Sequence, residues 1–281
     1  MNNPSETDQP TVESLSQQIK DLAPWHHDIQ LTGDLSTGQI FSEDGVLERP
    51  ENDGVSLISP RNIFRKKIQQ LYPDGLAGKR FLDCACNAGV YCFLARELGA
   101  QHSVGFDVRE HWIAQAKFVQ QHRTVASTDQ IDFSILDVYD LAKQGLKPFD
   151  LTLFSGIFYH LPDPIHGLKL AADLTTEVII VNTASLDDDE NPKGLTMHRR
   201  NPQNLEGNVM SGVYEIAWFP NGPQAIAEIL YWLGFVEVKL VRRIKKEKGQ
   251  RGRGRFEVIG ARSKGRLDNL EGDLLSQRED M

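Results

Sequence analysis

The feature that most constrains the fold is an alternation of short apolar runs with helical patterns between residues 80 and 183. The apolar runs have the length of strands, and segments with helical spacing separate several of them. The runs are RFLDCA from residue 80, HSVGFD from 102, IDFSIL from 131, FDLTLFS from 149 and EVIIVNT from 177, with helices expected near 89–98, 110–122 and 164–173. This order predicts an α/β fold whose sheet is mostly parallel, with crossover helices on both faces.

The end of the domain departs from this alternation. After a helix expected from about residue 223 to 232, the runs FVEVKLVRRI and RFEVIGARS predict a C-terminal antiparallel hairpin. A dehydrogenase of this class would add a sixth parallel strand instead. No clean Gly-x-Gly-x-x-Gly follows the first strand either, so both observations disfavour NAD as the cofactor.

The flanking segments complete the predicted organisation. The polar composition of both ends predicts disorder. Val12 to Leu22 has helical spacing, and Ser59-Pro60 is typical of a helix start. We therefore expect a disordered tail at 1–11, an N-terminal helix and cap segment at 12–75, a main domain at 76–263 with an insertion at 184–219, and a disordered tail at 264–281.

Composition limits the partners and the compartment. Lys plus Arg is 31 and Asp plus Glu is 39, which gives a formal net charge of −8. An acidic chain is a poor generic binder of nucleic acid, so we expect no DNA partner, although a local basic patch for RNA stays open. The three cysteines, Cys84, Cys86 and Cys92, are an odd count within nine residues and indicate small buried side chains rather than disulfides. The polar N-terminus and the lack of an 18-residue apolar run predict a cytoplasmic protein without a membrane span. No metal-ligand spacing is present, so no metal is expected.

The first strand ends in a sequence typical of a tight ligand-binding turn. Asp83 is followed at every second position by Ala85, Asn87 and Gly89. Gly89 adopts positive φ freely, and Asn87 is among the non-glycine residues that tolerate it best. Such a turn would bring backbone amides and a helix start to a ligand. A tight turn without a ligand is the better explanation of the glycine spacing taken alone.

Two acidic residues follow the next strands. Asp107, at the tip of the second strand and 24 residues after Asp83, could accept both hydroxyls of a ribose or cap the following helix. Asp137, followed by Val138, could accept an adenine amino group or cap a turn.

With these residues, positions 80–183 resemble the class I methyltransferases that use S-adenosylmethionine (SAM). The usual Asp-x-Gly-x-Gly-x-Gly motif is reduced here to Asp83, Ala85, Asn87 and Gly89. The resemblance implies that the turn faces the methionine end, Asp107 the ribose and Asp137 the adenine. The full set of expected cofactor-binding residues is Asp83, Ala85, Asn87, Gly89, Asp107, Val108, Asp137, Val138 and Ser155.

A narrower resemblance rests on Trp25-His26-His27, Phe149-Asp150, Ser155 to Leu161, Pro164 and Gly234-Phe235. These are similar to the branch that contains the tRNA wobble-uridine carboxymethyltransferases. Enzymes of that kind use carboxy-SAM and hold its extra carboxylate with basic and aromatic residues, of which Tyr159 matches the tyrosine.

The basic partners of such a set are harder to find. No Lys or Arg lies between Asp150 and Leu168. Arg65, Lys66 and Lys67 are candidates by rough position alone, and a solvated helix face is the simpler explanation for them. We therefore expect ordinary SAM rather than carboxy-SAM.

The fourth strand leads to the candidate catalytic residues, Tyr159 and His160, at the edge where such sheets bind ligands. His160 could act as a base at neutral pH or pack against a helix. The insertion is interpreted as a substrate lid, with a decoration that binds nothing as the alternative. The expected substrate-binding residues are His26, His27, Arg199, Tyr214 and Trp218.

Three functions follow from these observations. The first is a methyltransferase for a small metabolite, sugar or natural-product acceptor. The second is a tRNA-modifying methyl- or carboxymethyltransferase, and the third is a non-catalytic SAM-binding module. The basic stretch 242–255 would contact RNA under the second, but the acidic chain as a whole favours a solvated hairpin tip.

Overall fold

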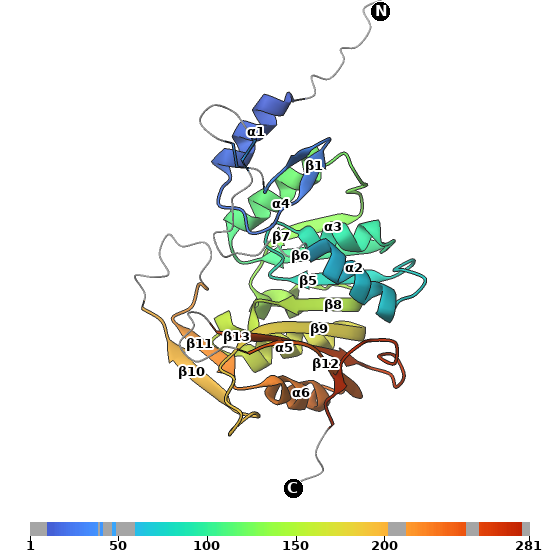
Figure 1. The fold of residues 1–281 in the computed structure, drawn as a ribbon, viewed down its shortest axis with the longest axis vertical. Coiled ribbons are helices and arrows are strands. Elements are labelled where there is room, and N and C mark those ends of the chain that lie inside the picture. Colours follow the sequence, from blue (N-terminus) through green and yellow to red (C-terminus); the bar gives the residue numbers. More distant parts are fainter. Residues whose placement is uncertain are drawn as a thin grey trace, which may run out of the picture.

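A computed structural model describes residues 10–38, 40–41, 47–48, 60–201, 212–245 and 253–276. Its centre is an eight-stranded sheet in the order β14-β12-β13-β9-β8-β5-β6-β7 (Figure 1). The strands are β5 (Arg80–Cys84), β6 (His102–Asp107), β7 (Ile131–Ile135), β8 (Phe149–Ser155), β9 (Thr175–Ser185), β12 (Glu237–Ile244), β13 (Gly254–Ala261) and β14 (Asp273–Leu274).

The strand directions confirm the predicted fold. Strands β7, β6, β5, β8 and β9 pair in parallel, whereas β13 runs antiparallel to β9 and β12 antiparallel to β13. The first strand, β5, lies between β6 and β8, so the chain order reverses there. In open α/β sheets ligands bind at such a reversal, outside the carboxyl ends of the strands.

Helices cover both faces of the sheet. One buried cluster joins α2 (Pro60–Leu71), α3 (Val90–Glu97) and α4 (Glu110–His122) to one face. The other joins the 3₁₀ helix η1 (Val138–Gln144), α5 (Pro164–Asp173) and α6 (Pro223–Trp232) to the opposite face. Neighbouring residues alternate between the two clusters because successive side chains of a strand point to opposite faces: Phe81 belongs to the first and Leu82 to the second.

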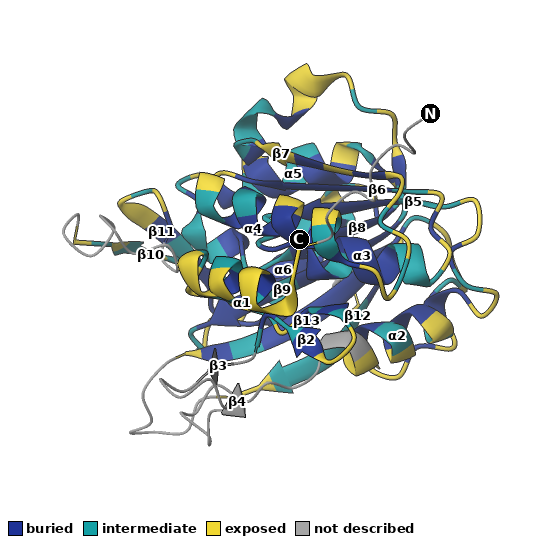
Figure 2. Cartoon of the chain, turned by 90° about the horizontal axis from the view of Figure 1, so that it is seen from above, coloured by how far each residue is buried: buried dark blue, intermediate teal, exposed yellow. Residues whose placement is uncertain are grey.

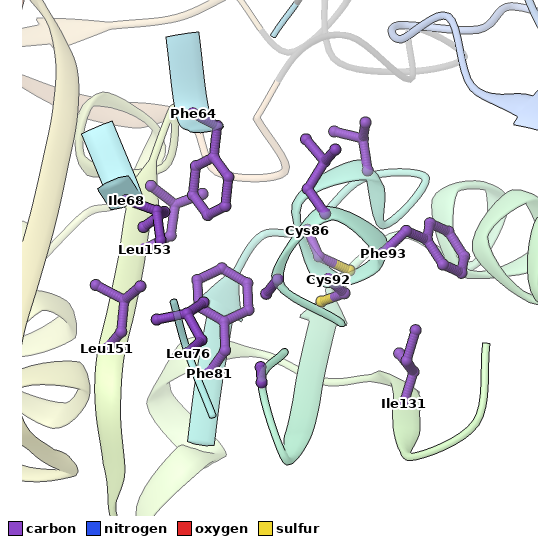
Figure 3. Packing of buried hydrophobic residues seen from close by; sticks show 14 of the residues in the cluster. Phe64, Ile68, Leu76, Phe81, Cys86, Cys92, Phe93, Ile131, Leu151 and Leu153 are labelled. Carbon is purple, nitrogen blue, oxygen red and sulfur yellow. The ribbon is translucent and has the colours of Figure 1, made fainter. Parts of the chain in front are cut away.

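The first of these buried clusters packs around β5, the first strand of the main domain (Figure 3). Phe64 of α2 packs edge-on against Phe81 of β5, with ring centroids 5.9 Å apart. All three cysteines are buried, as predicted. Removing a buried aromatic side chain of this kind typically costs about 3–5 kcal/mol, so this packing is what fixes the start of β5 and the turn that follows it.

The N-terminal segment is held against the domain. Helix α1 (Val12–Asp21) begins at Thr11, whose hydroxyl accepts a hydrogen bond from the Ser14 amide. On α4, the Gln115 side chain donates to the carbonyls of Leu22 and Pro24 at 2.6 and 2.9 Å. The short hairpins β1 (Gln30–Thr32) with β2 (Leu35–Ser36) and β3 (Ile40–Phe41) with β4 (Leu47–Glu48) follow.

The insertion contains regular structure that the sequence analysis missed. Strands β10 (Leu195–Arg199) and β11 (Ile216–Pro220) form an antiparallel ribbon that projects from one end of the sheet (Figure 1). Strand β9 runs on to Ser185, so the insertion begins later than residue 184. Residues 202–211 of the expected lid lie outside the described residues.

The expectation of disorder from residue 264 is wrong for residues 264–276. Leu267 and Leu270 are buried, and the Lys239 ammonium donates to both of their carbonyls at 2.8 and 3.0 Å. Strand β14 then pairs with β12 at the sheet edge. Two apolar side chains and a strand bridge hold this segment despite its polar composition. The rest of this tail, 277–281, and residues 1–9 of the first lie outside the described residues.

Burial follows the layers of the fold, with the central strands buried and the outer faces of the helices exposed (Figure 2). Within the described ranges, no helix has the length and apolarity needed to cross a membrane.

Candidate cofactor and acceptor site

The turn after β5 has the strained backbone that the sequence predicted. Asn87 and Gly89 have φ values of 52° and 78°, and Ala85, which was not expected to, has 61°. A Cβ on Gly89 would lie 2.4 Å from the Phe133 side chain. Glycine is therefore required there on two counts, the positive φ and the close contact.

Asp107 ties this turn to the tip of β6. Its Oδ2 accepts from the Asn87 amide at 3.2 Å and its Oδ1 from the Arg109 amide at 3.0 Å. Burial raises the pKa of this carboxyl, and these backbone donors oppose the rise. Asp107 is not the helix cap considered above, because Arg109 occupies the N-cap position of α4. Each carboxylate oxygen has a further lone pair, so two hydroxyls can still be accepted.

Asp83 is the unsatisfied group of the site. Its side chain is buried, and Oδ2 has no hydrogen-bond partner among the described residues. Burial, followed by the nearby Asp107 carboxylate, raises its pKa well above the usual range. A buried carboxyl without a partner is costly, and a ligand ammonium would satisfy it. Asp83 could bind the ammonium of a ligand, and Asp107 could accept its ribose hydroxyls. Together they fit an amino-acid nucleoside such as SAM.

Asp137 already has two partners. Its Oδ1 accepts from the Tyr139 amide at 3.0 Å, which caps η1, and its Oδ2 accepts from the hydroxyl of Tyr214. Tyr214 thus reaches the cofactor side of the site rather than the acceptor side. Val138 is buried, whereas Val108 is 40% exposed. Ser155 is the half-buried last residue of β8.

His26 and His27 lie beside the turn, as their proposed role requires. The His27 ring is 4.6 Å from that of His26 and 5.9 Å from that of Tyr91 on α3. Burial, followed by the charge of His26, lowers the pKa of His27 to about 3, and a hydrogen bond with the Asn87 side chain opposes this. His27 is therefore neutral near pH 7. Trp25 is structural, since its indole donates to the Ile19 carbonyl at 2.8 Å.

Arg255 is the site residue that the sequence analysis missed. Its Nη1 donates to the Tyr159 hydroxyl at 3.3 Å and its Nη2 to the Asn182 side chain at 2.8 Å. Asn182 lies opposite Ser155 in the β8–β9 pairing. In sequence Arg255 belongs to a basic run, and only the register of β13 against β9 brings it to Tyr159.

His160 lies in a strongly positive environment. It belongs to the 3₁₀ turn η2 (Phe158–His160) that follows β8. Burial, followed by Arg200, Arg255 and Arg109, lowers its pKa to about 3. Its Nδ1 is buried and has no partner within the described part of the chain. In this state His160 is a neutral and weakly basic group, which does not favour the simple role of a base poised at neutral pH.

Two of the expected substrate-binding residues already have partners within the chain. The Arg199 side chain is 79% exposed and faces Glu215 at 3.7 Å, so it points to solvent. Trp218 donates from its indole to the Pro162 carbonyl at 3.0 Å, which anchors β11 to the loop after η2. The neighbouring Arg200 reaches the site instead, donating to the Tyr159 carbonyl at 3.0 Å.

Comparison with known proteins identifies the family. A family model described as a methyltransferase domain matches residues 76–234, which is more than half of the chain. The chain belongs to this methyltransferase family. Its cofactor is SAM, and the turn, Asp83 and Asp107 described above lie within the matched residues.

Relatives of this methyltransferase carry two kinds of name. A tRNA U34 carboxymethyltransferase from Campylobacter hominis is 31% identical over 117 residues, covering 41% of this chain and 39% of the relative. A ubiquinone biosynthesis O-methyltransferase from Idiomarina loihiensis is 32% identical over 111 residues, covering 40% of this chain and 44% of the relative. The matches therefore span less than half the length of either relative.

A solved structure shares the fold over almost the whole chain. The N-terminal domain of EvdMO1 with SAH bound has a TM-score of 0.67 at 18% identity, covering 92% of this chain and 99% of that one. At this identity the likeness shows the fold alone. Among the described residues no three His, Cys, Asp or Glu side chains are grouped so that they could hold a metal ion.

Proposed function

We propose that this protein transfers the methyl group of SAM to a small-molecule acceptor, such as a metabolite, sugar or natural-product precursor. The observation that carries the proposal is the meeting of two groups of residues at one sheet edge. The cofactor turn with Asp83 and Asp107 lies on one side, and Tyr159, His160 and Arg255 lie on the other. When bound, SAM supplies an electrophilic methyl group.

The residues of the chain would then mainly align the acceptor, because a sulfonium leaving group is already activated. Tyr159 presents a hydroxyl that Arg255 holds in place. His27 lies beside the cofactor turn, where it hydrogen-bonds the Asn87 side chain. The projecting ribbon supplies Tyr214 and Arg200 as the opposite wall. The expected cytoplasmic location stays a prediction.

The test combines native mass spectrometry with turnover. We expect SAM or its demethylated product to co-purify with the protein, and methyl transfer from labelled SAM to a panel of small hydroxyl, amine and carboxylate compounds. Tight SAM binding with no turnover on any acceptor, including tRNA, would favour a non-catalytic binding module instead. Failure to bind SAM at all would overturn the proposal.

Two observations favour the second candidate, tRNA modification with carboxy-SAM. The Campylobacter relative is named for that reaction. Arg255 also supplies the basic residue beside Tyr159 that the sequence seemed to lack, and a guanidinium next to a hydroxyl suits a carboxylate.

The other basic candidates argue against carboxy-SAM. Arg65 pairs with Glu97 and Lys66 with Glu271, and the buried Lys67 pairs with the buried Glu257 at 2.5 Å. All three therefore already have carboxylate partners. Ordinary SAM stays the preferred cofactor, and direct competition between SAM and carboxy-SAM for the protein decides between them. Salt-dependent retention of tRNA would separately test the RNA partner.

A further inference from the structure

Three arginines at the acceptor side have no acidic partner among the residues that the structure describes. Arg200, Arg253 and Arg255 form no ion pair with any carboxylate in the described ranges, whereas Arg65, Arg123, Arg243 and Arg266 each do. The chain as a whole carries a net charge of −8. A concentration of unneutralised cations in an acidic protein is unexpected for a merely structural region.

The three guanidinium groups surround one aromatic pair. The Tyr159 and Phe219 rings stack with centroids 5.7 Å apart and planes 18° from parallel. The Arg253 guanidinium lies 3.8 Å from the centre of the Phe219 ring, and that of Arg255 lies 5.5 Å from the centre of the Tyr159 ring. Arg200 reaches the same place through the Tyr159 carbonyl. The aromatic faces hold Arg253 and Arg255 but do not neutralise their charge.

The cations also act on one another and on His160. Burial, with an added contribution from the charge of Arg253, lowers the pKa of Arg200. His160 has a buried Nδ1 without a described partner, in the field of Arg200 and Arg255. The arginine charges repel one another, and the His160 Nδ1 atom beside them has no described partner. A negatively charged group that also forms hydrogen bonds would satisfy both.

We propose that the acceptor carries an anionic group, a carboxylate or a phosphate, which Arg200 and Arg253 bind beside the Tyr159–Phe219 pair. This inference rests on the proposed function and names the chemical class of its acceptor. Arginine suits the role because its planar donors match carboxylate and phosphate oxygens in pairs. Arg255, held by Tyr159 and Asn182, forms the inner wall of the same positive surface.

Binding of the anion has a consequence for His160. The negative charge offsets the arginine contribution to the lowered pKa of His160, so this pKa rises above its value in the free protein, while burial, the larger cause, still keeps it below the ordinary value. The anionic group would thus both select the acceptor and make His160 more basic once the acceptor is in place.

The test measures anion binding to the full-length protein saturated with SAH. Inorganic phosphate, benzoate and the neutral benzyl alcohol are titrated separately, with isothermal titration calorimetry as the readout. Arg200→Gln and Arg253→Gln are compared with Arg199→Gln, a matched control because Arg199 is the next residue on the ribbon and faces solvent. We expect one or both anions to bind, and each site variant to weaken them by about tenfold. Arg199→Gln should leave binding unchanged.

Each outcome has a definite meaning. Tighter binding of benzoate than phosphate identifies a carboxylate acceptor, and the reverse identifies a phosphate. Equal binding in all three variants, or benzyl alcohol binding as tightly as benzoate, overturns the inference. SAM affinity is measured in every variant as the check on folding. Normal SAM binding without anion binding defeats this inference alone, whereas loss of SAM binding in the unmodified protein defeats the proposed function.

Discussion

Charged groups at the two ends of the parallel strands differ in whether they are paired. We call the end where these strands begin the amino edge and the end where they finish the carboxyl edge. At the amino edge, Glu177 pairs with Lys79 and Arg266, both at 2.6 Å, and Lys79 also contacts Asp150. At the carboxyl edge, Asp83 is buried with an oxygen that has no described partner, and Arg200 lacks an acidic one. Charges that satisfy each other stabilise a fold, whereas charges left unsatisfied at the ligand-binding edge are available to a ligand. For these residues the comparison separates ion pairs that stabilise the fold from groups that are available to a ligand.

The largest expected effect is acid destabilisation that originates at the carboxyl edge. His27 and His160 have pKa values of about 3 in the folded protein, below the ordinary 6.5 of the unfolded chain. Their contribution to stability is complete above pH 6.5 and is lost as the pH falls, because only the unfolded chain takes up these protons. The free energy of unfolding should drop by about 1.4 kcal/mol per pH unit for each histidine between about pH 6 and 4.

Urea unfolding at a series of pH values measures this slope. His27→Gln and His160→Gln should each reduce this slope by the contribution of one histidine, about 1.4 kcal/mol per pH unit. This holds even where the variant is less stable at pH 7. An unchanged slope in both variants would mean that neither histidine is held neutral by the fold.

The second effect tests the cofactor side of the same edge. Asp107→Ala removes an acceptor proposed for the ribose hydroxyls, and hydrogen bonds to a charged group contribute about 1.5–3 kcal/mol each. SAM affinity measured by calorimetry should fall by about tenfold or more. The protein should stay folded, as its melting curve would show. An affinity equal to that of the unmodified protein would remove Asp107 from the cofactor site.

The third and smaller effect belongs to the amino edge. Glu177→Gln weakens the links to Lys79 and Arg266 and should cost about 1 kcal/mol of stability. SAM affinity should not change, because the substitution lies at the opposite end of the strands. A loss of SAM binding without a loss of stability would contradict the division between the two edges.

The sequence predicted the elements of this fold well because they depend on local patterns. The apolar runs and helical spacings between residues 80 and 183 are repeated in the strands and helices observed there. The turn was predictable for a similar reason, since Asn and Gly are the residue types that adopt positive φ most readily, as Asn87 and Gly89 do here.

What could not be predicted depends on register and on contacts between distant segments. Arg255 reaches Tyr159 only because β13 pairs with β9 in one particular alignment, which no local pattern specifies. Likewise the C-terminal segment is ordered through contacts of Lys239 with the carbonyls of Leu267 and Leu270. For the same reason the sequence analysis named Arg199 and did not name Arg200, although Arg200 is the one that contacts Tyr159.

The smallest expected effect concerns the choice between SAM and carboxy-SAM. Arg255 and Glu257 lie two positions apart on β13, so their side chains share one face of the sheet, where Glu257 holds Lys67. Glu257→Gln removes that negative charge and leaves Lys67 without its partner. Because one added cation near the site attracts a carboxylate only moderately after solvent relaxation, we expect the ratio of carboxy-SAM to SAM affinity to rise by only a few-fold.

Lys66→Gln is the matched control, since Lys66 pairs with Glu271 on the exposed surface and should not alter the ratio. If unmodified protein already prefers carboxy-SAM and Glu257→Gln changes nothing, the pairing of Lys67 does not set cofactor choice. Arg255 with Tyr159 would then be sufficient to bind the extra carboxylate, and tRNA modification would become the better supported function.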